Sequence, residues 1–488
     1  MKERMDRRPG QRRPANRPSA QSRRKGTTGY ARPSTRTRGT RVRNTTPPSA
    51  SVRGMGNHRS ARGTGRPRAS KANHAGASGT LLTRRHFLYG AIGVGAVAAV
   101  GFGANTLIQQ RNAASSTIST LSVPASNVFT LDDYAEIELN NAFEQVGEYE
   151  LPYGTLMWCN DDSIATCLIP TETASPLTQI GVMKLSSGNL ETVVEAANGA
   201  SDGFEIYDVR GTSSGLVWTE ANIFEGTWRI LTATLSSSNS VGTAHVVDSG
   251  DSSTETPSIA AVDGYAYWVV MPPAGADNEK TGTAQLKRAQ FGQESTQTVY
   301  EGTGRMAAPL YGASDGVVIT PRHPDGTSYF QLVHVNGSTG EVDDSITLPS
   351  AMQPVEVGYG NDRFSFCFEA IYSYGDGIAN LGTYTPTTNP NGNYDSASWF
   401  RFGRTPLAPP AWCDDWLIVK SSQSVVAINF ASKSYCTFGI ISGATSWGDY
   451  LAMSGTHDRV VTISQINEID TESNANQTCT VRVWKPLS

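Results

Sequence analysis

The segment DGVVITPRHPDGTSYFQLVHVNGSTGEV, residues 315–342, holds two β-hairpins in succession. Its Asp315-Gly316 turn opens a short run of β-branched residues, and a second turn at Asn336–Gly340 separates two strands of alternating apolar and polar residues. Such alternation on both sides of Gly- and Asn-containing turns is typical of antiparallel hairpins. Two hairpins in a row predict a four-stranded antiparallel sheet.

The turn that opens this segment recurs seven times along the chain, each time before a short aromatic or β-branched strand. The copies begin at Asp162, Ser214, Asp263, Asp315, Asp362, Asp415 and Asp449. They follow one another at intervals of 52, 49, 52, 47, 53 and 34 residues. Four-stranded sheets at a period near 50 predict a β-propeller of about seven blades, with six or eight as the neighbouring counts. The short last interval predicts that the first strands of the domain complete the last blade. A pair of β-sandwiches is the rival architecture.

These copies resemble the pyrroloquinoline-quinone-type and related bacterial propeller repeats. In those repeats an Asp-Gly turn precedes the second strand and a Thr-Gly turn closes the last hairpin. The likeness covers about residues 146–488 and is closest at Asp315–Val342. The tryptophan usual in such blades is missing from most copies, so the resemblance implies an all-β propeller at 146–488 but neither a quinone cofactor nor dehydrogenase activity. We expect no cofactor.

Charge divides the chain into two unlike parts. Residues 1–111 hold 24 of the 40 Lys and Arg residues and only two acids, whereas the other 377 residues have a balance of −26. The Arg-, Pro-, Gly- and Ser-rich residues 1–80 lack the apolar side chains to form a core, so we expect a disordered cytoplasmic tail. Met55 is an alternative start. The acidic body is unsuited to binding nucleic acid, because phosphate contacts need basic residues.

The segment Leu82-Thr83-Arg84-Arg85-His86-Phe87-Leu88 precedes a Gly- and Ala-rich apolar run from Tyr89 to Ile108. It resembles the twin-arginine translocation signal, whose elements here are Arg84, Arg85, Phe87 and Leu88. The resemblance implies export by the twin-arginine translocase. A plain membrane helix with cytoplasmic arginines is the alternative. Either places the C-terminal body outside the membrane.

Residues 81–110 are therefore expected to be a signal or anchor helix, and residues 111–145 a linker to the body. The run from Phe87 to Ile108 is long enough to cross a bilayer, which favours a single-pass protein of the cell membrane. Ala96-Val97-Ala98 is a small-residue pattern that would allow cleavage and secretion instead.

All six cysteines follow the apolar run, and none forms a C-x-x-C pair. Cys159 and Cys167 flank the predicted turn at Asn160–Asp162, so they could form a disulfide across a hairpin or remain as two buried thiols. The four histidines of the body have no metal spacing. Asn389, Asn391, Asn393 and Asp395 alternate as in a calcium loop, but the glycine stands at the wrong place, so we expect a polar loop and no metal.

Two segments match the esterase pattern G-x-S-x-G, around Ser213 and Ser314. A nucleophile elbow needs a strand-to-helix turn and occurs once per domain. These two segments occupy the same place in two repeats, so they are predicted to be hairpin turns without a catalytic serine.

In a propeller, the turn between the second and third strands and the connection between blades open on the same face, where ligands usually bind. This placement predicts one candidate binding face, with Glu220, Arg322, His323, Glu369, Tyr372, Tyr374, His457 and Asp458. We expect a non-enzymatic envelope module that binds a protein or glycan. The alternative is a propeller lyase or hydrolase acting on cell-wall or host glycans.

Overall fold

The computed structural model describes residues 118, 128–173, 176–350, 352–368, 380–384, 398–401, 406–421, 423–469 and 475–487. These residues form seven largely antiparallel sheets of at least four strands each. In the described part of the chain the only helical elements are three short 3-10 turns: η2 (Leu131–Asp133), η3 (Leu139–Asn141) and η4 (Ala200–Asp202). The prediction of an all-β propeller is confirmed.

The first three blades each follow the chain from the inner to the outer strand. Blade 1 has β4 (Leu156–Trp158), β5 (Ile164–Pro170), β6 (Thr178–Lys184) and β7 (Leu190–Val194). Blade 2 has β8 (Glu205–Thr212), β9 (Gly215–Asn222), β10 (Thr227–Thr234) and β11 (His245–Gly250). Blade 3 has β12 (Ser258–Val262), β13 (Tyr265–Val270), β14 (Thr283–Gln290) and β15 (Thr296–Thr303).

Blades 4 to 6 carry additional short strands. Blade 4 has β16 (Tyr311–Gly312), β17 (Gly316–Ile319), β18 (Arg322–His323), β19 (Gly326–Asn336) and β20 (Val342–Thr347). Blade 5 has β21 (Pro354–Gly360), β22 (Arg363–Phe368), β23 (Asn380–Tyr384), β24 (Ser398–Arg401) and β1 (Val128–Thr130). Blade 6 has β25 (Ala411–Cys413), β26 (Trp416–Lys420), β27 (Val425–Asn429), β28 (Ser434–Phe438), β2 (Ala135–Glu136) and β30 (Gly455–His457).

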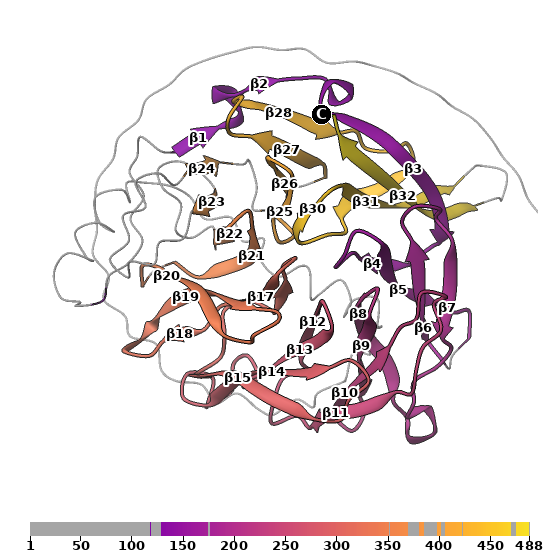
Figure 1. Cartoon of the computed structure of the whole chain (residues 1–488), viewed down its shortest axis with the longest axis vertical. Coiled ribbons are helices and arrows are strands. Elements are labelled where there is room, and N and C mark those ends of the chain that lie inside the picture. The colour runs from indigo at the N-terminus through magenta and orange to yellow at the C-terminus, as the bar shows by residue number, and fades with distance from the viewer. Residues whose placement is uncertain are drawn as a thin grey trace, which may run out of the picture. The chain divides into compact units, whose positions relative to one another are not determined.

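Blade 7 joins the two ends of the domain. It has β29 (Ala444–Leu451), β31 (Val460–Ile469) and β32 (Ala475–Pro486), and its outer strand is β3 (Phe143–Pro152), from the beginning of the domain. The β3–β32 ladder runs from Phe143 opposite Pro486 to Pro152 opposite Thr478. The prediction that the first strands complete the last blade is confirmed, and Figure 1 shows the sheets arranged around a common axis.

The apolar core lies between neighbouring sheets. Each of the five largest buried clusters draws its residues from adjacent blades, for example blades 1 and 2 or blades 3 and 4. Trp218, Trp268 and the strand residues Val317, Phe366 and Leu417 are buried as expected. Trp158 is only half-buried, and the Arg210 guanidinium lies 4.0 Å above its ring.

The predicted position of the seventh repeat is wrong. Asp449 lies within β29, the first strand of blade 7, whereas the other six copies open second strands. The equivalent turn is His457-Asp458-Arg459 before β31, and it resembles the Asn361-Asp362-Arg363 turn of blade 5. The interval of 34 residues arises from this wrong assignment, because Asp449 within β29 is followed by apolar residues, as the aspartates of the repeated turns are.

The expected linker at 111–145 is wrong over its second half. Residues 128–145 include β1 and β2, which pair in parallel with the outer strands β24 and β28. These strands have three and two residues, too few to show alternation in the sequence. The domain therefore begins near residue 128 and not at 146.

Cys159 and Cys167 are two of six buried free thiols in the structure, which has no disulfide between them. In the β4–β5 hairpin, Cys167 lies opposite Met157 and not opposite Cys159. The tail at 1–80, the helix expected at 81–110 with Arg84, Arg85, Phe87 and Leu88, and the loop at Asn389–Asp395 lie outside the described residues. Within those residues, no helix is long and apolar enough to cross a membrane.

Candidate functional site

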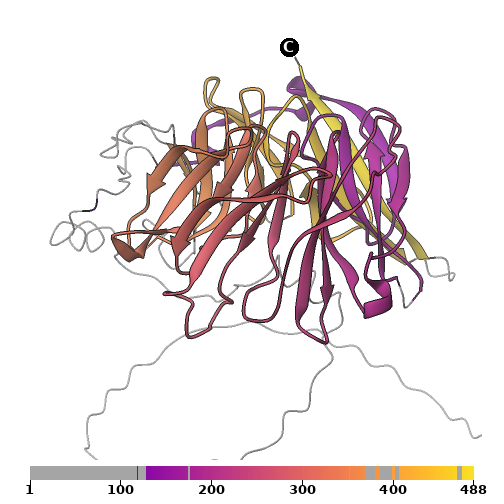
Figure 2. The ribbon, with the colours of Figure 1, turned by 60° about the horizontal axis from the view of Figure 1, so that its bottom comes forward.

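The antiparallel blades give the propeller two unlike ends, seen from the side in Figure 2. We call one the 1–2 face. It carries the turns that join the first strand of a blade to the second and the third to the fourth. The other, the 2–3 face, carries the turns between second and third strands and the connections between blades.

The predicted binding set is divided between the two faces. Glu220, Arg322 and His323 lie toward the 2–3 face as predicted, at the ends of β9 and in β18. His457 and Asp458 lie on the 1–2 face, because the seventh repeat begins at Asp458 and not at Asp449. Glu369, Tyr372 and Tyr374 lie outside the described residues.

Glu220 holds the fold together and is not available to a ligand. Its side chain is fully buried, pairs with Arg229 at 2.9 Å and accepts hydrogen bonds from the backbone nitrogens of Asn198 and Gly199. Trp218 Nε1 donates a further hydrogen bond to it at 3.2 Å. Glu220 therefore fixes the connection between blades 1 and 2. A buried carboxylate with this many donors is a structural anchor.

Arg322 is mostly buried against its own hairpin. It donates to the Thr327 carbonyl at 2.8 Å, lies 4.6 Å above the Phe330 ring and is 3.8 Å from Glu279 of blade 3. Burial lowers the pKa of Arg322, an effect that Glu279 opposes. His323 Nδ1 accepts a hydrogen bond from the Asp325 backbone nitrogen. Both residues shape the β18–β19 hairpin and do not converge with Glu220.

A groove lies on the 1–2 face, where blades 7, 1 and 2 meet. It has a volume of about 420 Å³. Its polar lining consists of Asp162, Ser163, Lys184, Ser186, Ser213, Ser236, Ser237, Asn239 and Arg459. The wall therefore combines five hydroxyls and one amide with groups of both charges.

Hydrogen bonds between blades fix the wall of this groove. Asp161 accepts from the backbone nitrogens of Ser163 and Ile164 in its own turn, and from that of Ser213 in blade 2 at 2.6 Å. Asn239 donates to Glu191 at 2.7 Å. The Lys184 ammonium forms no ion pair within the described part of the chain. It remains available to a bound ligand.

His457 and Asp458 stand at the rim of the groove. His457 is buried, with Nε2 2.6 Å from the Ser454 carbonyl and Nδ1 3.0 Å from Asp162, which joins blade 7 to blade 1. Asp458 accepts from Arg459 at 2.5 Å and from Lys485 at 3.2 Å. The hydrogen bond from Arg459 is the main reason that the pKa of Asp458 falls to about 2. Arg459 is thereby held at the groove wall.

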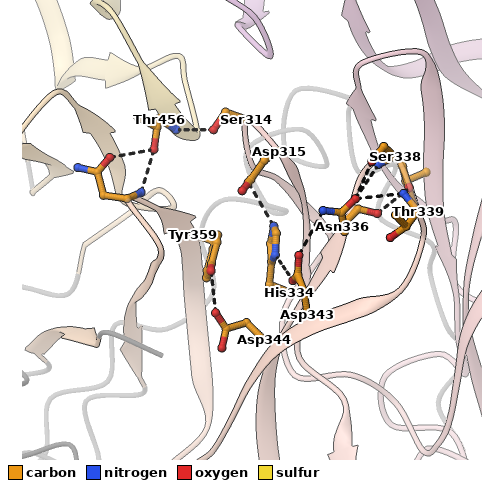
Figure 3. Close-up of polar contacts among 12 residues, drawn as sticks. Ser314, Asp315, His334, Asn336, Ser338, Thr339, Asp343, Asp344, Tyr359 and Thr456 are labelled. Atoms are coloured by element: carbon orange, nitrogen blue, oxygen red, sulfur yellow. Dashed lines mark hydrogen bonds and ion pairs between the residues drawn. The ribbon is translucent and has the colours of Figure 1, made fainter. Parts of the chain in front are cut away.

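The propeller axis is obstructed at this same face. The loop that carries His457 turns inward and adds β30 in parallel to β25, the inner strand of blade 6. Gly455 has a φ of +85°, and a Cβ there would lie 2.5 Å from the Ser314 nitrogen of blade 4. The Thr456 nitrogen donates to Ser314 Oγ at 3.4 Å, as Figure 3 shows. Backbone from opposite sides of the ring thus meets near the axis.

A buried histidine joins blades 4 and 5 on the 1–2 face (Figure 3). His334 is 1% exposed and stacks on Tyr359 at 3.9 Å, with Asp343 at 2.6 Å from Nδ1 and Asp315 at 3.3 Å from Nε2. Burial alone would lower the pKa of His334, but the bonds to and charges of Asp315 and Asp343 outweigh it and raise that pKa. We call His334, Asp315, Asp343 and Tyr359 the His334 clasp, because the stack of His334 on Tyr359 joins the two blades.

A second set of ionisable groups lies on the inner strands. Tyr311 donates to Glu356 at 2.5 Å, linking blades 4 and 5. Burial raises the pKa of Glu356 to about 7, an effect that the Tyr311 bond opposes. Burial and Glu356 raise the pKa of Tyr311, while the charge of Arg210 lowers it. Arg210 is paired with Asp208 at 2.5 Å. This set could not be predicted from the sequence, because neither Glu356 nor Asp208 belongs to a motif.

Three candidates remain: the two serines of the G-x-S-x-G pattern, a metal site and a second groove. Ser213 and Ser314 lie in 1–2 turns as predicted, between strands and not before a helix. Among the described residues there is no group of three or more His, Cys, Asp or Glu side chains suited to a metal. A second groove, of about 250 Å³, lies on the 2–3 face of blade 2 beside Tyr207, Trp228 and Pro273.

Comparison with known proteins shows likeness at the level of structure only. Neither a protein-family model nor a curated protein matches this chain. A prolyl endopeptidase structure matches with a TM-score of 0.44 and 8% identity, covering 72% of this chain and 48% of that one. The WD40 domain of SCAP from fission yeast has a TM-score of 0.39 and 9% identity, with coverage of 76% and 98%. TolB from Acinetobacter baumannii has a TM-score of 0.32 and 10% identity, with coverage of 68% and 65%.

This chain spans about half the length of the first of these structures. Matches this distant carry no argument about function. The propeller assignment rests on the strand order described above.

Proposed function

We propose that this chain is a binding module of the cell envelope that presents the 1–2 groove to a hydroxyl-rich partner, a glycan. The groove itself supports the proposal most directly. Its hydroxyl, amide and charged lining can exchange hydrogen bonds with sugar hydroxyls, and Lys184 can pair with a sugar carboxylate. A protein partner offering a polar loop is the other possible occupant.

Export by the twin-arginine route, with the apolar run retained as a single-pass anchor, is part of this proposal. The residues that support it are Arg84, Arg85, Phe87 and Leu88, followed by the apolar run that ends at Ile108. A conservative Arg84→Lys, Arg85→Lys double variant should leave the body in the cytoplasm. If its surface exposure is unchanged, only the plain membrane anchor remains.

Binding is tested with the full chain and a panel of neutral and carboxylated oligosaccharides. Lys184→Ala should weaken binding of the carboxylated members by about tenfold, corresponding to about 1.4 kcal/mol, and spare the neutral ones. Lys280→Ala is the matched control, because Lys280 lies in the 2–3 loop of blade 3, away from the groove. Equal loss in both variants, or no binding of any oligosaccharide, contradicts a glycan site here.

A second candidate is an enzyme acting on glycans, and the Tyr311–Glu356 pair is the observation that favours it. A carboxyl with a pKa of about 7 can both give and take a proton near neutrality, and Arg210 can stabilise negative charge close by. In that case the oligosaccharide panel should be cleaved, as seen by mass spectrometry. Glu356→Gln should then abolish cleavage and leave binding to the groove intact.

A further inference from the structure

The 2–3 face carries a set of exposed large apolar side chains. Phe224 is 97% exposed and Ile223 is 58% exposed at the β9–β10 turn of blade 2, and Trp447 is 49% exposed at the start of blade 7. Leu177, in the β5–β6 loop, and Ile440, before β29, are exposed on the same face. The set spans the neighbouring blades 6, 7, 1 and 2.

These side chains stand on well-fixed backbone. Lys420 Nζ donates to the Trp447 carbonyl at 2.8 Å, and Gln423 donates to the Ser446 carbonyl at 3.0 Å. Asn222 Oδ1 accepts from the Glu225 nitrogen at 3.2 Å across the turn that holds Phe224. Leaving aromatic side chains fixed in water brings no stability, and exposed apolar groups gathered on one face indicate an interaction surface.

Ile118, the first residue that the structure describes, lies at this face. Ile118 lies against the tip of the β18–β19 hairpin of blade 4, where a Cβ on Gly326 would meet Ile118 Cδ1 at 2.8 Å. Ile118 lies only ten positions after Ile108, the end of the apolar run. Ten fully extended residues span at most about 36 Å. A membrane-embedded Ile108 would therefore keep the 2–3 face close to the bilayer.

We infer that the 2–3 face lies against the outer surface of the membrane, with Phe224, Ile223 and Trp447 inserted among the lipid headgroups. The inference rests on the retained anchor of the proposed function. Aromatic and aliphatic side chains favour the bilayer interface, where they bury apolar area among headgroups. Two arginines of this face are paired, Arg305 with Glu255 at 2.7 Å and Arg322 with Glu279. We therefore expect the exposed apolar side chains to provide the contact and use lipid without net charge in the test.

The orientation also assigns a role to each face. With the 2–3 face on the membrane, the groove at Lys184 and Arg459 points away from it, toward envelope partners. The predicted binding face and the observed groove are then opposite ends of one tethered body.

The test uses the full-length chain reconstituted into phosphatidylcholine vesicles that contain a headgroup spin-labelled lipid. All six native cysteines are buried, so a fluorophore can be placed on Phe224→Cys, on Trp447→Cys and on the matched control Val342→Cys. Val342 is an exposed apolar residue at the 1–2 end of blade 4. We expect the spin label to quench positions 224 and 447 about threefold more than position 342, because interfacial burial reaches about 5–10 Å into the headgroups.

The possible outcomes test the orientation and the anchor separately. Equal quenching at the three positions, with the chain bound to the vesicles, overturns the orientation and leaves the anchor standing. Failure of the chain to float with the vesicles overturns the anchor and this inference together. The oligosaccharide measurements are independent of both, so a failure of the glycan site is recognised separately.

Discussion

The two faces of the propeller differ in how their turns are held. On the 1–2 face, blades are tied together by His457 to Asp162, by the stack of His334 on Tyr359, and by the contact of Gly455 with Ser314. On the 2–3 face the turns end in exposed apolar tips such as Phe224. A polar, cross-linked end can keep a groove in one shape. An end with apolar tips on fixed turns can instead contact an apolar surface.

The largest expected difference between the faces concerns two glycines. Gly455→Ala on the 1–2 face should destabilise the protein by about 3 kcal/mol, because the residue has a positive φ and its Cβ would collide with the Ser314 backbone. Gly439→Ala is the control on the 2–3 face, where a Cβ would meet nothing within 4 Å. Urea unfolding of both variants gives the comparison. Similar losses would show that the contact at Ser314 is not a tight one.

The same logic separates two glycines that occupy one repeat position. In the turn before β13, the residue with a positive φ is Asp263, at 49°, and not Gly264. Gly264→Ala should therefore be nearly neutral, since a Cβ there meets no neighbour. Gly316→Ala should cost about 2 kcal/mol, because its Cβ would press on the Val335 carbonyl at 2.3 Å and on His334. Thermal unfolding of the two variants distinguishes them. Equal effects would contradict the packing at Gly316.

The clasp at His334 predicts a pH dependence. The pKa of His334 is raised in the folded protein. Its ion pairs therefore contribute fully to the free energy of unfolding below the unfolded pKa of about 6.5, and this contribution is lost as the pH rises through the folded pKa. His334→Gln should cost about 2 kcal/mol at pH 6 and less at pH 9. Tyr359→Phe keeps the ring and removes only the bond to Asp344, so it is the control. A cost that does not change between these pH values would mean that the imidazole is not charged.

Filling the groove tests the polar face without changing its charge. Ser237→Trp should reduce oligosaccharide binding by about tenfold or more, because an indole would occupy the groove beside Ser236 and Asn239. Ser252→Trp fills the second groove on the 2–3 face and should leave binding unchanged. Calorimetry on the full chain measures both. Loss of binding in the second variant alone would move the site to the other face.

The smallest effect is expected at the apolar tips. Phe224→Ser should change the free energy of unfolding by less than about 0.5 kcal/mol, because the ring contacts water and little else. Its consequence should appear only in the vesicle experiment. A clear loss of stability in detergent-free buffer would show that Phe224 packs within the protein.

The fold could be predicted from the sequence because each blade repeats one local pattern. The sequence predicts six of the seven turns at the correct place, because an Asp or Gly turn followed by a short apolar strand can be recognised within one blade. The seventh was misplaced because β29 contains a bulge between Ala444 and Asp449, which disturbs its alternation. That single shift moved His457 and Asp458 to the wrong face.

The candidate site could not be predicted from a local sequence pattern. The groove takes Arg459 from blade 7, Lys184 from blade 1 and Ser237 from blade 2, residues that are adjacent only after the ring closes. The serines look like ordinary turn residues, and Glu220 looks like a surface acid until Arg229 and two backbone nitrogens are seen around it. A pattern within one repeat cannot report on contacts between repeats.

The way the chain enters the ring also has a mechanical consequence. From the N-terminal side, β1, β2 and β3 attach in turn to the rims of blades 5, 6 and 7 before blade 1 begins, as Figure 1 shows. A pull between the tether and a captured partner would thus be shared by three sheets. The antiparallel β3–β32 ladder would bear the remaining tension along its length. Its hydrogen bonds would then be loaded in shear and resist together.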